Sequence, residues 1–173
     1  MVIDKGKRIF KRAESGSIKI SDNALQVIFQ FRQLLPDATE AGGVLLGRFI
    51  LESEDIVVDD VTTPGEEDKR TRNRFVRNKR RHQLEVTRRW RESGGTCNYL
   101  GEWHTHPEPM PLPSPEDICD WRRTLREAQF DSETLFFVIV GTDDLLTWEG
   151  FKKTLEIRQL ALEVREGERN GKT

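Results

Sequence analysis

Apolar side chains recur at helical spacing near the start of the chain. Ser21 followed by Asp22 is typical of a helix start, because a serine hydroxyl can cap free backbone N–H groups. Pro36 and Asp37 end the pattern, so we predict one amphipathic helix between residues 22 and 35. The positions at helical spacing are mostly apolar: Leu25, Ile28, Phe29, Arg32 and Leu35.

Short apolar runs bounded by turn residues predict most of the β-structure. A Ser-Glu-Asp turn at residues 53–55 separates the first two runs, which we expect to pair. The run LFFVIV at residues 135–140 has the strongest strand character in the chain. The last run could be a strand or a helix. The six runs are Gly43–Leu51, Ile56–Thr62, Asn98–His106, Leu135–Val140, Leu145–Phe151 and Leu155–Leu162.

Two further helices are predicted in the middle of the chain. Residues 78–91 form the first, although its apolar stripe is not clean. The second begins after Ser114, with Pro115 at its first position and Asp117 three residues after the cap. Its core-facing side consists of Ile118, Trp121, Leu125 and Ala128. Residues 63–75 are polar, charged and contain a proline, so we predict a mobile loop there.

Helices and strands that mix along 173 residues predict one layered α/β domain. We expect this single domain over residues 1–173, with an ordered core from about residue 17 to 165. No run approaches the roughly 18 apolar residues of a membrane span. Met1–Arg12 has no apolar stretch of the kind found in secretory signals. Cys97 and Cys119 lie in no CxxC pattern, so we expect a cytoplasmic protein.

Positive charge is concentrated in one segment of a chain whose net charge is only −2. Between Lys69 and Arg91 there are eleven Lys or Arg residues and one acid, Glu85, so the segment carries a charge of +10. Such a segment could bind an acidic protein surface or nucleic acid. The simpler interpretation, a solvated loop and helix face, is the one we favour, and both alternatives stay open.

Two histidines stand at the end of the strand predicted over residues 98–106. Side chains alternate along a strand, so His104 and His106 project from the same face, with Cα atoms roughly 6.5–7 Å apart. Neutral imidazoles at that separation can bind one zinc ion, and a carboxylate completes three ligands with a position left for water. Asp117 can supply the carboxylate, because the proline-rich loop returns the chain. Cys119 is about 200° around the helix from Asp117, so it should face away from the metal.

The combination of these residues is more specific than any of them alone. His-x-His, seven residues, Ser114, two residues and Asp117 follow one another without a gap. H-T-H-P followed by P-S-P-E-D resembles the JAMM signature of the JAB/MPN metalloprotease family. An upstream segment, T-E-A-G-G-V-L-L-G, resembles that family's glycine-rich strand start, and its acid is Glu40. The resemblance covers residues 21–140.

This resemblance implies a central mixed β-sheet flanked by helices, with zinc near the end of a strand. It also implies that His104, His106 and Asp117 are metal ligands. Glu40 would be the general base, and Ser114 would support the oxyanion. Zinc makes water a nucleophile at neutral pH, and a carboxylate can carry its proton to the leaving amine.

Two other residues compete for roles near the site. Glu102 lies two residues before His104, so on a regular strand it faces the metal. It could act as the base, as an extra ligand, or by orienting the ligands. We prefer Glu40 because its Gly-Gly context resembles the family pattern. His82 belongs to no motif and is expected at the surface or partly buried.

The family contains proteins with different functions. Its members remove ubiquitin-like proteins from amines, trim carrier-protein tails, or act as scaffolds without metal. G-E-W-H-T-H-P-E-P resembles small bacterial JAB proteins encoded beside E1/E2-like proteins in antiphage signalling operons. That resemblance implies a substrate conjugated through the C-terminus of a ubiquitin-like protein or a CD-NTase-like nucleotidyltransferase. The competing hypothesis is a non-catalytic module that binds protein or nucleic acid, although the net charge points to no polyanionic partner.

Overall fold

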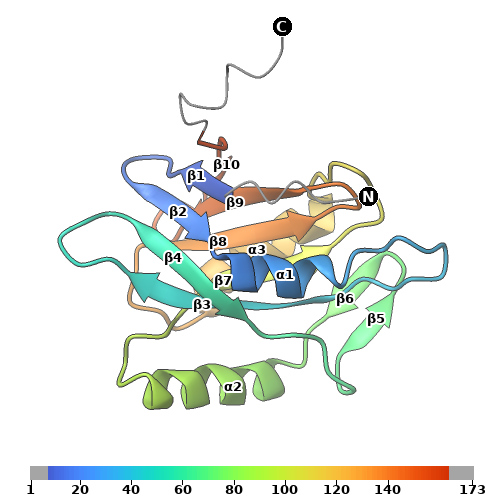
Figure 1. Ribbon diagram of the computed structural model, residues 1–173, viewed down its shortest axis with the longest axis horizontal. Helices are drawn as coiled ribbons and strands as arrows, with labels where there is room; N and C mark the ends of the chain where they lie inside the picture. Colours follow the sequence, from blue (N-terminus) through green and yellow to red (C-terminus); the bar gives the residue numbers. More distant parts are fainter. Residues whose placement is uncertain (1–7, 164–173) are drawn as a thin grey trace, which may run out of the picture.

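The computed structural model describes residues 8–163, which fold around one curved β-sheet (Figure 1). Eight strands form the sheet in the order β1-β2-β4-β3-β7-β8-β9-β10, and β5 and β6 form a separate hairpin. The helices are α1 (Asp22–Phe29), α2 (Lys79–Glu92) and α3 (Pro115–Glu127). The strands are β1 (Arg8–Lys11), β2 (Ser17–Ile20), β3 (Gly42–Phe49), β4 (Ile56–Val61), β5 (Lys69–Thr71), β6 (Arg74–Val76), β7 (Asn98–Thr105), β8 (Thr134–Val140), β9 (Leu145–Phe151) and β10 (Ile157–Gln159).

The sheet is mixed, as the family resemblance implies. β2 pairs in parallel with β4, and β7 pairs in parallel with β8, whereas the other neighbours run antiparallel. The chain crosses from β7 to β8 through α3, because a parallel pair cannot be joined by a tight turn. Every residue of β8 is buried, which agrees with a strand covered on both faces.

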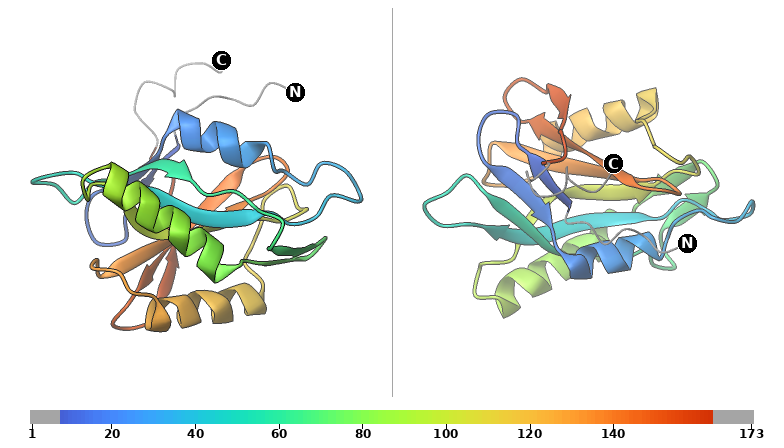
Figure 2. Two further views of the ribbon diagram at one scale, coloured as in Figure 1. Left: turned by 90° about the horizontal axis from the view of Figure 1, so that it is seen from below. Right: turned by 45° about the horizontal axis from the view of Figure 1, so that its top comes forward.

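Helices cover both faces of the sheet (Figure 2). Ile28 of α1 belongs to one hydrophobic cluster together with Trp103 and Val138. Trp121 of α3 belongs to a second cluster together with Phe137. Val138 and Phe137 are neighbours on β8 and therefore point to opposite faces, so the two clusters lie on opposite sides of the sheet. The predicted single α/β domain with flanking helices is confirmed.

α1 is shorter than the helix that the sequence predicts. It ends at Phe29, although the apolar pattern continues to Leu35. The side chain of Gln33 turns inward and donates to the carbonyl oxygens of Ala38 and Arg72, at 3.2 and 2.8 Å. A buried amide thus organises this turn, and Leu35 is exposed.

The mobile loop predicted over residues 63–75 is wrong in its second half, which forms the β5–β6 hairpin. The hairpin is fixed to the chain that precedes β3. The N–H of Glu40 donates to the carbonyl oxygen of Thr71 at 2.8 Å, and Nε of Arg70 donates to the carbonyl oxygen of Glu40 at 2.7 Å. These partners are about thirty residues apart in sequence, so a local reading of polarity could not predict them.

The sheet also begins before residue 17, the predicted start of the core. β1 pairs with β2 at one edge, and Ile9 and Phe10 are buried. Two four-residue strands offer too little alternation to stand out. The last predicted run is a strand, β10, of only three residues, and the predicted boundary at residue 165 lies outside the described residues. Within residues 8–163 no helix has the length and apolar character to cross a bilayer.

A bulge in β7 shapes the face that carries the histidines. The pairing of β7 with β3 shifts between Gly101 and Tyr99. Gly101 has a φ of 144°, and a Cβ there would collide with the carbonyl oxygen of Phe136, so glycine is required. Because of the shift, Tyr99 and Glu102 lie on the same face, and the Tyr99 hydroxyl donates to Glu102 at 3.3 Å.

Candidate metal centre

Three side chains from two elements meet at the carboxyl end of β7. His104 lies on the strand, and His106 follows it, with its N–H donating to the carbonyl oxygen of Val140 at 2.9 Å. Asp117 lies in the first turn of α3. The Ser114 hydroxyl accepts from the Asp117 N–H at 3.1 Å, and the Ser114 N–H donates to the Asp117 carboxylate at 2.7 Å. This capping box orients Asp117 toward the imidazoles.

The three side chains are spaced like ligands of one ion. The Nε2 atoms of His104 and His106 lie 3.0 Å apart, and oxygens of Asp117 lie 3.3 and 3.2 Å from them. In a tetrahedral site with metal–ligand distances of about 2.0–2.1 Å, neighbouring donors are roughly 3.3 Å apart. The cluster therefore fits a metal ion, and two imidazoles with one carboxylate suit zinc. The structure brings the predicted ligands together, and their binding of zinc stays a prediction.

The charges of this cluster hold Asp117 in the anionic form that binds a metal, whereas they favour a proton on His106 that a metal would have to displace. Burial would raise the pKa of Asp117, but hydrogen bonds from His104 and His106 hold it well below its ordinary value. Burial would lower the pKa of His106, yet its hydrogen bond to Asp117 and the neighbouring carboxylates raise it. Asp117 is thus an anion at neutral pH, as a metal ligand must be.

Glu40, the predicted general base, lies beside the cluster. Its Oε1 is 4.0 Å from Nε2 of His106, so it is near the cluster without belonging to it. The side chain is buried, and this burial raises the pKa of Glu40 to about 7, against the opposing charges of His104 and His106. A carboxyl group that titrates near neutrality suits the acceptance and return of a proton.

The backbone that carries Glu40 is held by the histidine strand. The N–H of Ala41 donates to the Thr105 hydroxyl, and the N–H of Thr105 donates to the carbonyl oxygen of Ala41, each at 2.9 Å. The next residue, Gly42, lies against the ring of Phe75 in the hairpin, where any side chain would collide. The close packing of Phe75 therefore explains why position 42, two residues after Glu40, is a glycine.

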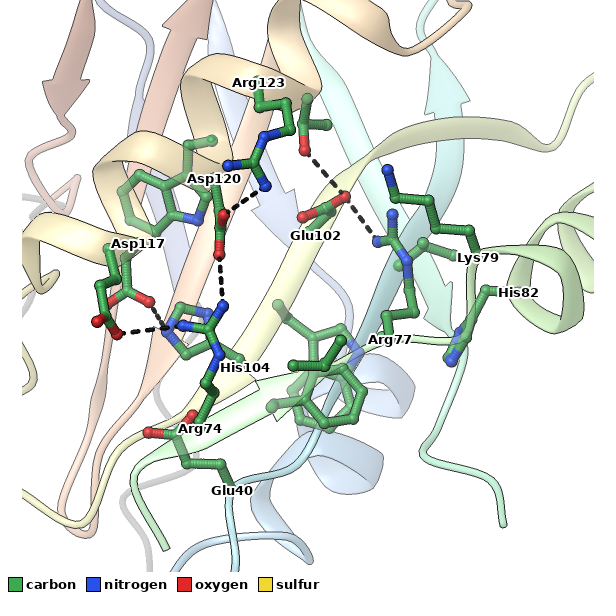
Figure 3. A pocket seen from close by; sticks show the side chains of 18 of the residues that line it. Glu40, Arg74, Arg77, Lys79, His82, Glu102, His104, Asp117, Asp120 and Arg123 are labelled. Atoms are coloured by element: carbon green, nitrogen blue, oxygen red, sulfur yellow. Dashed lines mark hydrogen bonds and ion pairs between the residues drawn. The ribbon is translucent and has the colours of Figure 1, made fainter. Parts of the chain in front are cut away.

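Glu102 faces the same side of β7 as His104, but its carboxylate is engaged elsewhere. It pairs with Arg77 at 2.6 Å (Figure 3) and accepts from Tyr99. A contact of 3.5 Å with the Thr124 hydroxyl joins it to α3. Glu102 lies outside the group of residues placed to share one metal ion. These contacts favour a role in the floor of the site over the roles of ligand or base.

Glu108 is a site residue that our sequence reasoning missed. Its Oε2 lies 3.3 Å from Nδ1 of His106, whereas Asp117 lies at Nε2 of the same ring. Histidines that bind metals are commonly oriented by a carboxylate on the other ring nitrogen. The signal available in the sequence was an acid two residues after His106.

The cluster lies in a groove of about 1050 Å³. β7 forms its floor, α3 lines one side, and β6 with the start of α2 lines the other (Figure 3). Near the cluster, Arg74 of β6 reaches across to α3, with Glu116 at 3.1 Å and Asp120 at 3.8 Å. The two walls are therefore joined by ion pairs close to His104.

His82 has a structural role that its sequence context did not predict. It is only 1% exposed, whereas we expected a surface or partly buried residue. Its Nδ1 is 2.6 Å from the Thr62 hydroxyl, and its Nε2 is 3.0 Å from Asp68. This network joins α2 to the chain after β4. The apolar face of α2 is interrupted because the polar side chain of His82 faces inward.

Comparisons with known proteins agree with this fold. A curated Vibrio cholerae protein named "CD-NTase/cGAS isopeptidase" is 36% identical over 145 residues, or 84% of this chain and 88% of that protein. An Escherichia coli protein of the same name is 33% identical over 143 residues, or 83% and 86% of the two chains. A "probable metalloprotease" of Sinorhizobium fredii is 35% identical over 87 residues, or 50% and 51%.

A solved structure and a family model also match this chain. The solution structure of a Desulfitobacterium hafniense protein, 22% identical, superposes with a TM-score of 0.56 over 90% of this chain and 99% of that chain. A family model described as prokaryotic homologs of the JAB domain matches residues 29–151, which include Glu40, His104, His106 and Asp117. This chain therefore belongs to the prokaryotic JAB-domain family.

Proposed function

We propose that this chain is a zinc-dependent isopeptidase of the JAMM type, in which His104, His106 and Asp117 hold the metal. One observation carries the proposal: three metal-binding side chains converge within 3.0–3.3 Å of one another at the head of a groove. The buried carboxyl group of Glu40 beside them and the family of the chain support it.

The residues around the metal cluster divide the chemistry between them. Zinc bound there would supply Lewis acidity that activates water at neutral pH. Glu40 accepts a proton from the attacking water and delivers it to the leaving amine as the amide C–N bond breaks. The Ser114 hydroxyl accepts the N–H of Asp117, so its own hydrogen is available to donate to the substrate carbonyl oxygen.

As substrate we propose an amide formed between the C-terminus of a CD-NTase or ubiquitin-like protein and an amine. The names of the Vibrio cholerae and Escherichia coli relatives, which align over most of both chains, support a CD-NTase. E1/E2-like proteins would make such a conjugate. The groove supports a flexible tail as the acyl part, because an extended segment can enter a channel that a folded domain cannot.

The basic segment supports the enzyme over a nucleic-acid-binding module. Most of its side chains bind backbone carbonyl oxygens or acids on α2, α3, β4 and β7. Arg74 and Arg77 join elements that line the groove. Cations engaged in this way are poorly placed to neutralise phosphates. Seven of the eleven have such partners: Arg70, Arg72, Arg74, Arg77, Arg81, Arg88 and Arg89.

Cleavage of defined fusions tests the proposal. A CD-NTase and a ubiquitin-like protein, each joined through its C-terminus to a reporter amine, would be incubated with zinc-loaded and chelator-treated protein. We expect cleavage at the end of the tail, its loss with the chelator and its return with zinc. If the zinc-loaded protein leaves both conjugates intact, the proposed function is wrong.

A further inference from the structure

A second hollow, which we call the distal hollow, lies at the far end of the groove. Its volume is about 210 Å³, below the roughly 300–1,000 Å³ of sites for whole small molecules, so it suits a single bulky side chain. Phe49 and Trp90, among its lining residues, are large aromatic side chains left 43% and 50% exposed. Val86 and Phe130 add further apolar surface.

The distal hollow continues the groove that begins at the metal cluster. The two share four lining residues, which come from α2, β7 and the chain after α3: Gln83, Val86, Tyr99 and Gln129. A ligand that extends from the metal cluster along β7 toward its start therefore arrives at the residues where the groove adjoins the distal hollow. Between the two ends the floor carries the Arg77–Glu102 ion pair (Figure 3).

The length of β7 sets the reach of such a ligand. His104 and Tyr99 are five residues apart, which is about 17 Å of strand at 3.3–3.4 Å per residue. The bulge next to Gly101 shortens this path by about one residue. An extended peptide has nearly the same rise, so its fifth or sixth residue from the metal cluster falls at the distal hollow.

The chemistry of an isopeptide decides which arm of the substrate lies there. The amine arm is a lysine side chain on a folded protein, too short to follow β7 to its start. The acyl arm is a C-terminal tail that can extend over several residues. Only the acyl arm can therefore connect the metal cluster with the distal hollow.

We propose that the distal hollow is a specificity subsite for a large apolar side chain at the fifth or sixth residue before the scissile bond. The inference rests on the proposed function and adds a requirement for the sequence of the substrate tail. The indole of Trp90 is held in position before any ligand binds. It lies against the turn at Gly95, whose N–H donates to the carbonyl oxygen of Trp90 at 2.8 Å. A preformed aromatic surface binds with little loss of side-chain entropy.

Fluorogenic tail substrates test this subsite directly. Each would carry eight residues before an amide to a lysine ε-amine, with one leucine moved through positions three to eight in a serine background. We expect leucine at position five or six to raise kcat/KM about tenfold over serine, because a buried apolar side chain contributes on that scale. Trp90→Ala should remove this preference by raising KM, with kcat unchanged.

Leu84 provides a matched control on the same helix. It is 64% exposed and lines neither the groove nor the distal hollow, so Leu84→Ala should keep the preference. Cleavage that is zinc-dependent but indifferent to the leucine position, or equal preference in wild type and Trp90→Ala, overturns the subsite alone. No cleavage of any substrate overturns the proposed function as well. A wild-type dimer that Trp90→Ala dissociates would assign the distal hollow to a second copy and also overturn the subsite.

Discussion

Nε of Arg70 donates to the backbone carbonyl oxygen of Glu40 at 2.7 Å, and the N–H of Glu40 donates to the carbonyl oxygen of Thr71 at 2.8 Å. The hairpin beside the groove and the residue proposed as general base are therefore one hydrogen-bonded unit. We therefore predict that a substrate that moves the hairpin also moves Glu40, which would couple occupation of the groove to the position of the base.

Arg70→Ala should lower kcat about tenfold while KM and zinc content stay close to wild type. A hydrogen bond from a charged donor contributes about 1.5–3 kcal/mol, and its loss frees the backbone that carries Glu40. Arg70→Lys should recover part of the rate. Arg80→Ala is the control, since Arg80 is exposed on α2. Wild-type kcat in Arg70→Ala, measured on any cleaved fusion, would contradict the coupling.

Glu40→Gln should keep the metal and lose activity. A positioned general base contributes about 10²–10⁴-fold, so kcat should fall on that scale. The variant should still bind an uncleaved conjugate, because the groove and the metal ligands are intact. Zinc analysis in parallel with the cleavage assay separates the roles. If Glu40→Gln loses its zinc, Glu40 is a ligand and the assignment is wrong.

Glu102→Gln should act mainly on stability and on KM. Glu102 and Arg77 pair at 2.6 Å with side chains only 18% and 20% exposed. Glu102→Gln leaves the charge of Arg77 largely buried without its partner, which lowers the free energy of unfolding by about 1–3 kcal/mol. Glu116→Gln is the matched control, because Glu116 is 72% exposed and pairs of this kind contribute about 0–1 kcal/mol. Equal denaturation midpoints for the two variants would contradict this account.

The His82–Asp68 network should make stability fall in mild acid. Burial lowers the pKa of His82 despite its hydrogen bond to Asp68, so the unfolded chain binds a proton below about pH 6.5 before the folded protein does. Burial alone would raise the pKa of Asp68, but N–H donors from Asn78 and Gly65 hold it below its ordinary value. That contribution is present above about pH 4 and is lost as the pH falls further.

Denaturation of the zinc-loaded protein between pH 7.5 and 5 measures this effect. His82→Gln should be less stable than wild type at pH 7.5, since it loses a buried network. Its stability should also depend less steeply on pH, because the group that takes up the proton on unfolding is gone. An unchanged pH slope in this variant would show that His82 is not the titrating group.

The sequence pattern predicted the helices and strands that are determined by residues adjacent in the chain. The capping box of α3 is set by Ser114, Pro115 and Asp117 within four residues, and β8 is an unbroken apolar run after its first residue, Thr134. The pairing of His104 with His106 follows from strand alternation alone. For these parts of the fold and site, sequence neighbours determine the structure.

The elements that were missed depend on distant partners. The β5–β6 hairpin is polar in sequence, and its order comes from bonds of Arg70 and Thr71 to Glu40. His82 is buried because Thr62 and Asp68 satisfy both ring nitrogens. Neither set of partners can be read from a window of the sequence, because the fold must first bring them together.

The metal content of the purified protein tests whether His104, His106 and Asp117 bind zinc. Elemental analysis of wild type, Asp117→Ala and the His104→Ala/His106→Ala double variant would be combined with circular dichroism to show that each is folded. We expect about one zinc ion per wild-type chain, bound by three side chains with a position left for water. The double variant should hold no zinc, and Asp117→Ala should lose most of it. Full zinc occupancy in the folded double variant would place the metal elsewhere and show that His104 and His106 are not its ligands.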